Sequence, residues 1–335
     1  MTRSPADSAA GRVSLPRRLA ATPAQAVKSL RTVRDLLRWA TSRLAQADAS
    51  PGHGTLSLSD EASQLVLWAL RLDHHDLPIW YDARLSPEER RVVAELVELR
   101  CTSRRPAAYL TGEAWLRGVC FKCDGRALVP RSVIAEALDN SFAEHVDRED
   151  RPPDWPATVL DLCTGGGSLA ILAAIRFPEA RIVGADLSTE ALALARENIE
   201  LHGLSGQIEL VQGDLFGPVR GTRFDLILCN PPYVNEASMQ ALPAEFRCEP
   251  ESALAGGHDG MDIVRRVLAK ASQQLAADGM LLIEIGHEAR HFERAFPRLE
   301  FSYLPVEAGE TMLVLVNAAA LRRTGSLSVP PTRRK

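Results

Sequence analysis

The spacing of apolar residues changes near residue 156 and divides the chain into two regions. Before this point, apolar side chains recur every three or four positions, as they do on one face of a helix. Beyond it, apolar runs of four to six residues alternate with helical stretches. This pattern predicts a small helical region followed by an α/β region.

Three helices are predicted in the first region. The earliest spans 26–47, where the helical spacing of apolar residues continues throughout. A second is expected to begin with Ser59 as its N-cap. The third begins at Ser86, with Pro87 at the first helical position and Glu89 completing a capping box.

The segment between the two regions predicts a hairpin and a further helix. Extended stretches at 115–121 and 128–129 flank a turn at Cys123–Gly125. A helix is expected over 132–145, and a charged, proline-rich linker over 147–156 leads into the second region.

The second region has the pattern of a doubly wound α/β domain. Nearly continuous apolar runs predict parallel strands buried on both faces, at 158–160, 181–185, 208–211, 224–228 and 280–285. Helices are expected between them, at 168–176, 188–202 and 260–276. Two final stretches, 301–305 and 311–316, can add an antiparallel pair.

The loop after the first strand is rich in glycine and is a candidate ligand site, because open parallel sheets bind ligands at the carboxyl ends of their strands. Its sequence is Asp161-Leu162-Cys163-Thr164-Gly165-Gly166-Gly167. Asp186 ends the second strand, nineteen residues after Gly167, a spacing that suits a carboxylate accepting both hydroxyls of a ribose. The alternative is that Asp186 caps the helix that begins near Ser188.

Asp214 and Phe216 follow the third strand. The carboxylate of Asp214 can accept from an adenine amino group, and Phe216 can pack on the ring. The alternative is a strand-to-helix cap with a core phenylalanine. Because the first loop lacks the G-x-G-x-x-G spacing, a nicotinamide cofactor is disfavoured.

Asn230-Pro231-Pro232-Tyr233 follows the fourth strand and carries the candidate chemistry. An amide or aromatic amine nitrogen is a poor nucleophile, because its lone pair is delocalised. The side-chain oxygen of Asn230 and the carbonyl of Pro231 can accept its two N–H groups, and Tyr233 can pack against the flat acceptor group. Orientation then supplies much of the acceleration, and no general base is assigned. The alternative is a rigid turn made by two prolines.

These loops resemble those of Rossmann-like S-adenosylmethionine methyltransferases, and the last one resembles the amino-methyltransferases that act on adenine N6 in DNA or on glutamine N5 in proteins. The resemblance to the protein glutamine-N5 methyltransferases covers about residues 26–317. Its motifs include Tyr109–Glu113, Val129–Arg131 and Arg247–Pro250.

The resemblance implies S-adenosylmethionine as cofactor, with Asp161 and the turn from Cys163 to Gly167 holding its methionine part. It also implies that Asn230 to Tyr233 bind the substrate, with Asn230 close to the cofactor as well. Within the family, Gly112–Trp115 and Pro130–Ser132 are most similar to the branch that acts on the third protein of the large ribosomal subunit.

Three alternatives to this substrate stay open. The sister branch methylates peptide release factors, and typically has Pro-Asp-Thr-Glu where this chain has Ser132-Val133-Ile134-Ala135. An adenine DNA methyltransferase is disfavoured, since no basic, aromatic-rich target-recognition segment is apparent. A non-enzymatic assembly factor would bind RNA through basic ends. Two departures from the family pattern are Gly166 in place of serine or threonine, and Cys248 in place of histidine.

The charge distribution adds a possible RNA contact. Net charge is -4, yet residues 1–50 carry nine basic and three acidic side chains, and 321–335 carry five basic ones and no acid. Basic ends can contact RNA weakly or can be solvated tails. Cys120 and Cys123 form a lone C-x-x-C, so no metal site is predicted and the six cysteines are expected to be reduced. No export signal or membrane-spanning run is seen, so a soluble cytoplasmic protein is expected; its oligomeric state is left open.

The expected fold is therefore α/β, a Rossmann-like S-adenosylmethionine methyltransferase domain with a small helical N-terminal domain. The expected organisation is a disordered leader (1–25), a helical substrate-recognition domain (26–105), a hairpin linker (106–130), the methyltransferase domain (131–318) and a basic disordered tail (319–335).

Overall fold

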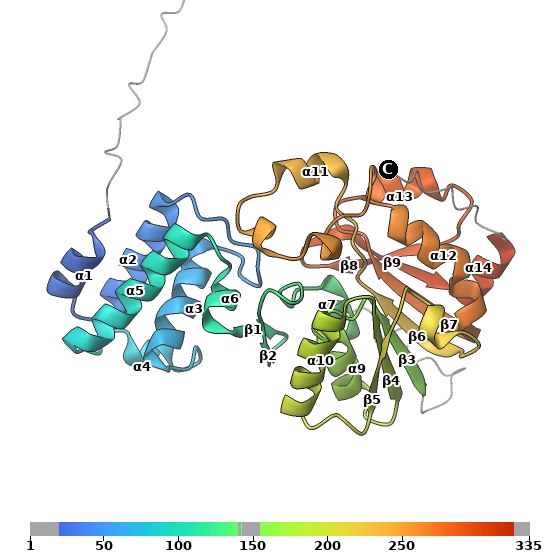
Figure 1. Cartoon of the computed structure of the whole chain (residues 1–335), viewed down its shortest axis with the longest axis horizontal. Helices are drawn as coiled ribbons and strands as arrows, with labels where there is room; N and C mark the ends of the chain where they lie inside the picture. The colour runs from blue at the N-terminus through green and yellow to red at the C-terminus, as the bar shows by residue number, and fades with distance from the viewer. Residues whose placement is uncertain (1–19, 140–141, 143–154, 325–335) are drawn as a thin grey trace, which may run out of the picture. The chain divides into compact units, whose positions relative to one another are not determined.

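A computed structural model describes residues 20–139, 142 and 155–324 (Figure 1). Within these residues the chain forms two compact units. The helical unit comprises 20–49 and 57–103, and the α/β unit comprises 50–56 together with 104–324. The described helices include none that is long and apolar enough to cross a membrane.

The helical unit is built from five helices, α1 (Pro23–Ser29), α2 (Val33–Gln46), α3 (Leu58–Leu70), α4 (Leu77–Trp80) and α5 (Pro87–Ser103). α2, α3 and α5 pack against one another, and α1 packs on α5. Their apolar faces meet in a core that includes Leu36, Trp39, Leu65 and Val97, all buried. The predicted helical region is thus confirmed as a unit with a core of its own.

The predicted single helix over 26–47 is wrong, because the chain breaks between α1 and α2. The hydroxyl of Thr32 accepts from the backbone N–H of Asp35 at 3.2 Å, and the Asp35 carboxylate accepts from the Thr32 N–H at 3.1 Å. This capping box starts a new helix. The apolar spacing continues across the break and therefore does not reveal it. α1 also begins at Pro23, inside the predicted leader, of which residues 1–19 lie outside the described part.

The N-terminal cap of α3 differs from the predicted one, whereas that of α5 agrees with it. α3 begins after Ser57, whose hydroxyl accepts from Asp60 N–H at 3.1 Å, so Ser59 is not the N-cap. The capping box at the start of α5 is confirmed: Glu89 N–H donates to the Ser86 hydroxyl at 3.2 Å, and Ser86 N–H donates to the Glu89 carboxylate at 2.8 Å.

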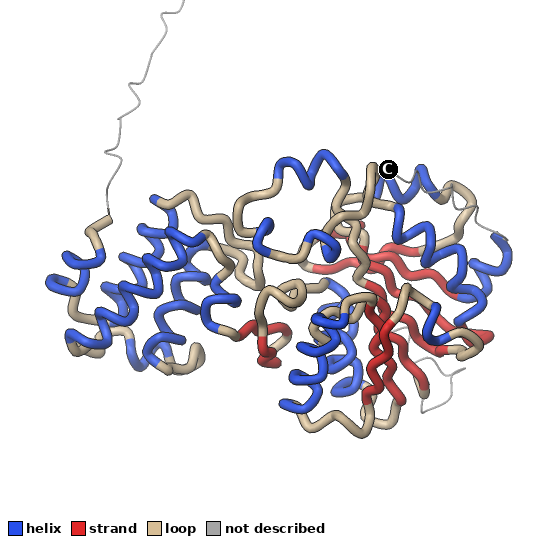
Figure 2. Tube along the Cα trace, in the orientation of Figure 1, coloured by secondary structure: helices blue, strands red, loops and turns tan. Residues whose placement is uncertain are grey.

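A seven-stranded sheet forms the centre of the α/β unit (Figure 2). Its strands are β3 (Thr158–Leu162), β4 (Arg181–Asp186), β5 (Ile208–Gln212), β6 (Phe224–Cys229), β7 (Leu275–Glu284), β8 (Ser302–Val306) and β9 (Gly309–Asn317). They lie in the order β5-β4-β3-β6-β7-β9-β8. The first five are parallel, as predicted, and β9 pairs antiparallel with both β7 and β8, which confirms the predicted final pair.

Helices cover both faces of this sheet. Val159 of β3 packs with residues of α7 (Val133–Asp139), α9 (Ser168–Arg176) and α10 (Thr189–Leu201). Leu160 and Leu162 point to the other face and pack with α12 (Asp262–Gln274), α13 (Ala289–Ala295) and α14 (Ala318–Thr324). The strands are therefore buried on both sides, which explains their nearly continuous apolar runs. The expected Rossmann-like architecture is confirmed.

The end of the α/β unit corrects the predicted tail. Residues 319–324 belong to α14, where Ala320 and Leu321 are buried against the sheet. Their apolar positions are too few to show a helical period in the sequence. The remaining tail residues, 325–335, lie outside the described part.

The hairpin is formed by β1 (Glu113–Leu116) and β2 (Val119–Lys122), so its turn is Arg117-Gly118 and not Cys123–Gly125. Both turn residues have positive φ, 51° and 76°. The hairpin packs on α10, where the side-chain oxygen of Asn198 accepts from the Lys122 N–H at 2.7 Å. Residues 128–129 form no strand.

Two further expectations concern the segments around the hairpin. Before it lies a short helix that was not predicted, α6 (Ala107–Thr111). After it, the helix expected over 132–145 is described as α7 up to Asp139, and 140–141 and 143–145 lie outside the described residues. The same holds for 147–154 of the expected linker.

Candidate functional site

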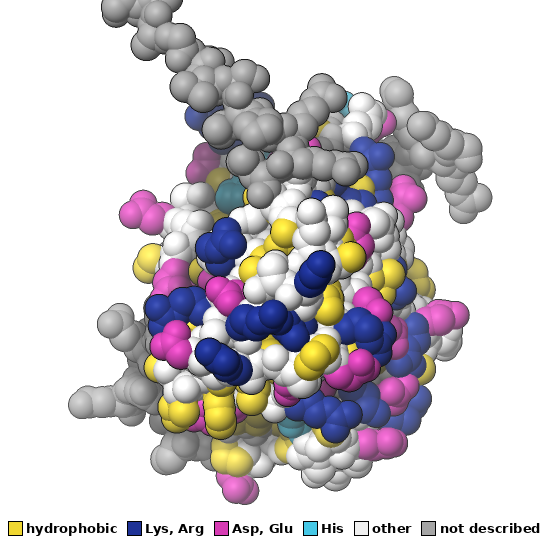
Figure 3. All heavy atoms as spheres, turned by 90° about the vertical axis from the view of Figure 1, so that its left-hand side faces the viewer, with side chains coloured by type: hydrophobic (Ala, Val, Ile, Leu, Met, Phe, Trp, Pro, Cys, Tyr) yellow, Lys and Arg dark blue, Asp and Glu magenta, His cyan; other side chains and the backbone are white. Residues whose placement is uncertain are grey.

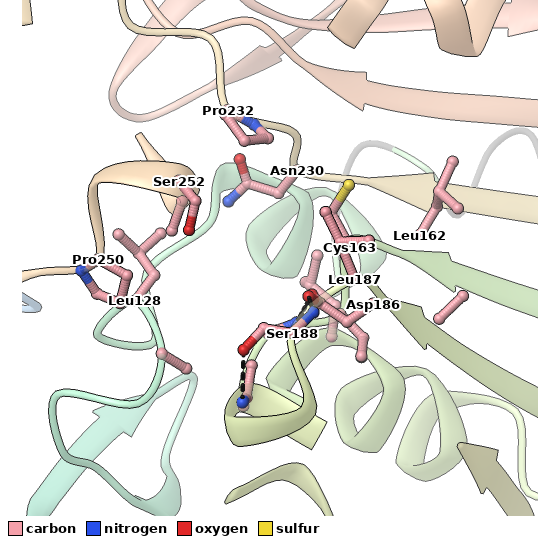
Figure 4. A pocket seen from close by; sticks show the side chains of 18 of the residues that line it. Leu128, Leu162, Cys163, Asp186, Leu187, Ser188, Asn230, Pro232, Pro250 and Ser252 are labelled. Atoms are coloured by element: carbon pink, nitrogen blue, oxygen red, sulfur yellow. Dashed lines mark hydrogen bonds between the residues drawn. The ribbon is translucent and has the colours of Figure 1, made fainter. Parts of the chain in front are cut away.

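A cavity of about 480 Å³ opens at the carboxyl ends of the parallel strands (Figure 4). The chain adds β4 and β5 on one side of β3 and then returns to place β6 on the other side, so strand order reverses between β3 and β6. Ligands of open α/β sheets bind at such a reversal. Loops after β3, β4, β5 and β6 all contribute to the lining.

The glycine-rich turn after β3 forms one wall of this cavity. Cys163, Thr164, Gly165 and Gly166 line it. Cys163 and Gly165 have positive φ, 65° and 55°, so the backbone turns sharply as it leaves the strand. Gly167 is not among the lining residues; it is the N-cap of α9, and a Cβ there would lie 3.1 Å from the Ala195 Cβ.

Asp161 is buried beneath this turn and does not line the cavity. Its Oδ2 accepts from the Thr164 hydroxyl at 2.5 Å and from the Ala170 N–H at 2.9 Å. Burial raises the pKa of Asp161 to about 7, although these two hydrogen bonds oppose the shift. Its Oδ1 is buried and has no hydrogen-bond partner among the described residues. Asp161 therefore shapes the turn from below.

Asp186 lies at the end of β4 and lines the cavity. Its carboxylate accepts from the Gly165 N–H at 2.8 Å and from the Ser188 N–H at 2.9 Å. The N-cap of α10 is Ser188, whose hydroxyl accepts from the Ala191 N–H at 3.1 Å. Asp186 thus joins the first two loops at the cavity, while Ser188 performs the capping.

The loop after β5 brings Asp214 to the cavity but leaves Phe216 out of it. Asp214 and Arg266 both line the cavity and form an ion pair. Phe216 is only 3% exposed, packs in the core beneath, and is not among the lining residues. Leu215, with a φ of 50°, lines the cavity instead. The structure therefore supports the core position of Phe216 that was the alternative.

Asn230 and Pro232 line the cavity, whereas Pro231 and Tyr233 are not among the lining residues. Figure 4 shows the Asn230 side chain projecting into the cavity between Ser252 and Cys163. Its Nδ2 lies 3.5 Å from the Arg131 carbonyl oxygen, to which it donates. The Tyr233 hydroxyl points away and donates to a Glu284 carboxylate oxygen at 2.9 Å.

Sequence reasoning missed the segment opposite this loop, residues 126–132, which also lines the cavity. Glu249 holds part of it: its carboxylate accepts from the Val129 N–H at 3.0 Å and from the Arg131 guanidinium at 2.6 Å. His53 Nε2 lies 3.3 Å from the same carboxylate. Burial works to raise the pKa of Glu249, but His53 and Arg131 outweigh it and lower the pKa below its ordinary value.

Within residues 20–139, 142 and 155–324, no group of three or more His, Cys, Asp or Glu side chains is placed to hold a metal ion. The six cysteines are free thiols. Cys163 is half-buried at the cavity wall, and Cys229 is buried at the end of β6.

Comparison with known proteins assigns the family. The family model of the Methyltransferase small domain matches residues 141–258, and that of the PrmC N-terminal domain matches residues 35–112. A ribosomal protein uL3 glutamine methyltransferase of Bordetella pertussis is 49% identical over 88% of this chain and 97% of its own length. Proteins of the same name from Burkholderia pseudomallei and Bradyrhizobium diazoefficiens are 48% and 41% identical, each over 87% of this chain and over 96% and 92% of their own lengths. The chain therefore belongs to the family of ribosomal protein uL3 glutamine methyltransferases.

Proposed function

We propose that this protein transfers a methyl group from S-adenosylmethionine to the side-chain amide nitrogen, N5, of a glutamine in ribosomal protein uL3. The observation that carries the chemistry is the projection of Asn230 into the cavity that Asp186 and the glycine turn line. The substrate is inferred from relatives that match most of this chain and are all named ribosomal protein uL3 glutamine methyltransferase. A cytoplasmic enzyme would meet this protein during ribosome assembly.

The cavity fits the cofactor in size and in the chemistry of its lining. Its volume of about 480 Å³ falls in the range of about 300–1,000 Å³ that small-molecule sites occupy. Asp186 offers a carboxylate to the ribose hydroxyls, and Asp214 offers one to the adenine amino group. The turn from Cys163 to Gly166 offers backbone to the methionine part. When bound, the cofactor supplies a methyl group on a sulfonium, which is a good electrophile.

Residues Asn230–Tyr233, the acceptor loop, hold and orient the glutamine amide. Since Asn230 Nδ2 donates to the Arg131 carbonyl, Asn230 Oδ1 is free to accept one N–H of the substrate. The carbonyl of Pro231 accepts the other. Two acceptors fix the plane of the amide and raise electron density on its nitrogen. The proton leaves after transfer, so no general base is needed before it.

Recognition of the rest of uL3 is assigned to the helical unit, the proposed substrate-recognition domain. Figure 3 shows one face of the molecule, on which basic, acidic and apolar side chains are interspersed. Within the helical unit, Arg34 forms an ion pair with Asp82, and Arg91 forms one with Glu88. The basic ends proposed to contact RNA include residues 1–19 and 325–335, which lie outside the described part.

A side-by-side labelling experiment tests this proposal. The full chain is incubated with methyl-labelled cofactor and either uL3, a peptide release factor or adenine-containing DNA. Label on glutamine of uL3 alone is the expected result. Label on the release factor in preference to uL3 would show that the release factor, and not uL3, is the substrate. A second arm uses a chain without 1–19 and 325–335; retained methylation would argue against an RNA-binding assembly factor.

A further inference from the structure

Two buried carboxylates hold the segment 129–133, which passes beside the acceptor loop. Glu249 accepts from the backbone N–H of Val129 and from the Arg131 guanidinium at one end. Glu284 accepts from the Ser132 hydroxyl at 2.6 Å and from the Val133 N–H at 3.1 Å at the other. The carbonyl of Arg131, between these anchors, receives the Asn230 side-chain amide.

Glu284 also holds the acceptor loop directly. It ends β7, the strand next to β6, and is 4% exposed. One of its oxygens accepts from the Tyr233 hydroxyl at 2.9 Å, and the other accepts from Ser132 and Val133. A single carboxylate therefore bridges the two segments that meet at Asn230.

The surroundings of Glu284 favour one position for the Tyr233 ring. Gly286, two residues after Glu284, has a φ of 53°, and a Cβ on it would lie 2.6 Å from the Tyr233 Cε2. The ring therefore fits only because this position lacks a side chain. Burial raises the pKa of Glu284, while hydrogen bonds from Ser132 and Tyr233 oppose the rise. In either protonation state its two oxygens remain hydrogen-bonding groups for both segments.

We propose that Glu284 is a positioning residue for methyl transfer: by bridging Tyr233 to Ser132 and Val133, it fixes the Arg131 carbonyl and hence the orientation of the Asn230 amide. Its side chain does not line the cavity and touches no reacting atom. If the bridge is lost, the Arg131 carbonyl shifts and the Asn230 amide can turn its Nδ2 toward the substrate. The Asn230 Nδ2 donor would then face a substrate N–H donor, and the substrate nitrogen that receives the methyl group would be misplaced. This inference rests on the proposed methyl transfer at this site.

The test compares four full-length variants with the wild type, using kcat and KM for uL3, the calorimetric Kd of S-adenosylmethionine, and Tm. Glu284→Ala removes both links, and Glu284→Gln keeps the shape and can bond to both sides once the Tyr233 hydroxyl reverses its role. A Tyr233→Phe, Ser132→Ala double variant removes the partner hydroxyls and leaves the carboxylate in place. Asp225→Ala is the matched control. Asp225 accepts from the Ala157 N–H, Thr158 N–H and Thr158 hydroxyl at 3.0, 2.9 and 3.0 Å, at the opposite edge of the sheet.

Since a displacement of about 1 Å can cost about a hundredfold in rate, Glu284→Ala should lower kcat at least about tenfold, with KM and Kd within about threefold of wild type. The double variant should fall similarly, Glu284→Gln should recover most of the loss, and Asp225→Ala should keep kcat within about twofold. The proposal is overturned if the double variant keeps wild-type kcat, if the losses appear in Kd, or if Glu284→Gln is as slow as Glu284→Ala at wild-type Tm. An inactive wild type would instead contradict the proposed function, so the two failures are distinguishable.

Discussion

The side-chain amide of Asn230 donates to the backbone carbonyl of Arg131, a residue 99 positions earlier in the chain. This contact joins the loop after β6 to the segment that follows the hairpin. It orients the Asn230 side chain, because an amide whose nitrogen faces a carbonyl must present its oxygen on the other side. In the proposed function, this oxygen is the acceptor for a substrate N–H.

Asn230→Ala is expected to lower kcat by about a hundredfold or more, because the substrate amide loses one of two acceptors that orient its nitrogen. Cofactor affinity should stay close to that of the wild type. Rapid-quench assays with uL3 and calorimetry with S-adenosylmethionine measure the two quantities. Asn317→Ala is a matched control, since this asparagine accepts from the Ala320 N–H far from the acceptor loop. A main defect in cofactor affinity would contradict the acceptor role.

Asp186→Ala is expected to give the opposite result. Its carboxylate lines the cavity and also accepts from the Gly165 N–H, so its removal takes away a ligand group and loosens the turn. Hydrogen bonds to charged groups contribute about 1.5–3 kcal/mol, which corresponds to a Kd roughly ten- to hundredfold weaker. The kcat at saturating cofactor should change much less. An unchanged calorimetric affinity for S-adenosylmethionine would show that Asp186 does not bind the cofactor.

The buried carboxyl of Asp161 predicts a pH dependence of stability. Its pKa is raised from 3.8 to about 7 by burial, so between these values the folded protein binds more protons than the unfolded chain. The favourable contribution is complete below about pH 4 and is lost as pH rises toward about 7. Asp161→Asn can keep the bonds from Thr164 and Ala170 but cannot ionise. In cofactor-free protein, the Tm difference between variant and wild type should therefore grow in favour of the variant from pH 5 to pH 7.5.

The matched control for this titration is Asp225→Asn, which replaces a carboxylate at the opposite edge of the sheet. Its Tm difference from the wild type should not follow the same profile. A parallel shift of Asp161→Asn and wild type across the whole pH range would show that Asp161 does not titrate in this interval.

Cys163 occupies a backbone conformation that favours glycine, with a φ of 65°. Cys163→Gly should therefore keep cofactor affinity within a few-fold. Cys163→Val should weaken it and lower Tm, because a β-branched side chain at positive φ costs about 1–3 kcal/mol. Calorimetry and thermal melts on the two variants check this. Equal affinities for Gly and Val would show that the turn does not need the left-handed conformation to bind the cofactor.

Much of the α/β unit could be predicted from the sequence because its strands are buried on both faces and bounded by turns. Asp186 and Asn230 could be placed at this cavity for the same reason: Asp186 ends such a strand, Asn230 directly follows one, and parallel strands bring their carboxyl ends to one side of the sheet. The break between α1 and α2 could not be predicted, because the apolar spacing continues across it. The capping box at Thr32 starts a new helix without interrupting that spacing.

Contacts between segments far apart along the chain could not be predicted from the sequence. The position of Phe216 just after a strand predicts a contact with the adenine, yet its side chain lies in the core. The bridge of Glu284 to Val133 joins residues 151 positions apart, and a glutamate at the end of an apolar strand gives no indication of its partners. The contact of Asn230 with the Arg131 carbonyl could not be predicted either, because every residue type carries a backbone carbonyl.

Tandem mass spectrometry of uL3 after incubation with the full chain and S-adenosylmethionine identifies the atom that is methylated. We expect a single added methyl group on the side-chain amide of one glutamine, present with the wild type and absent with Asn230→Ala at equal cofactor occupancy. A methyl group on a lysine, an arginine or a backbone nitrogen of uL3, or a methylated glutamine of equal yield with Asn230→Ala, would contradict it.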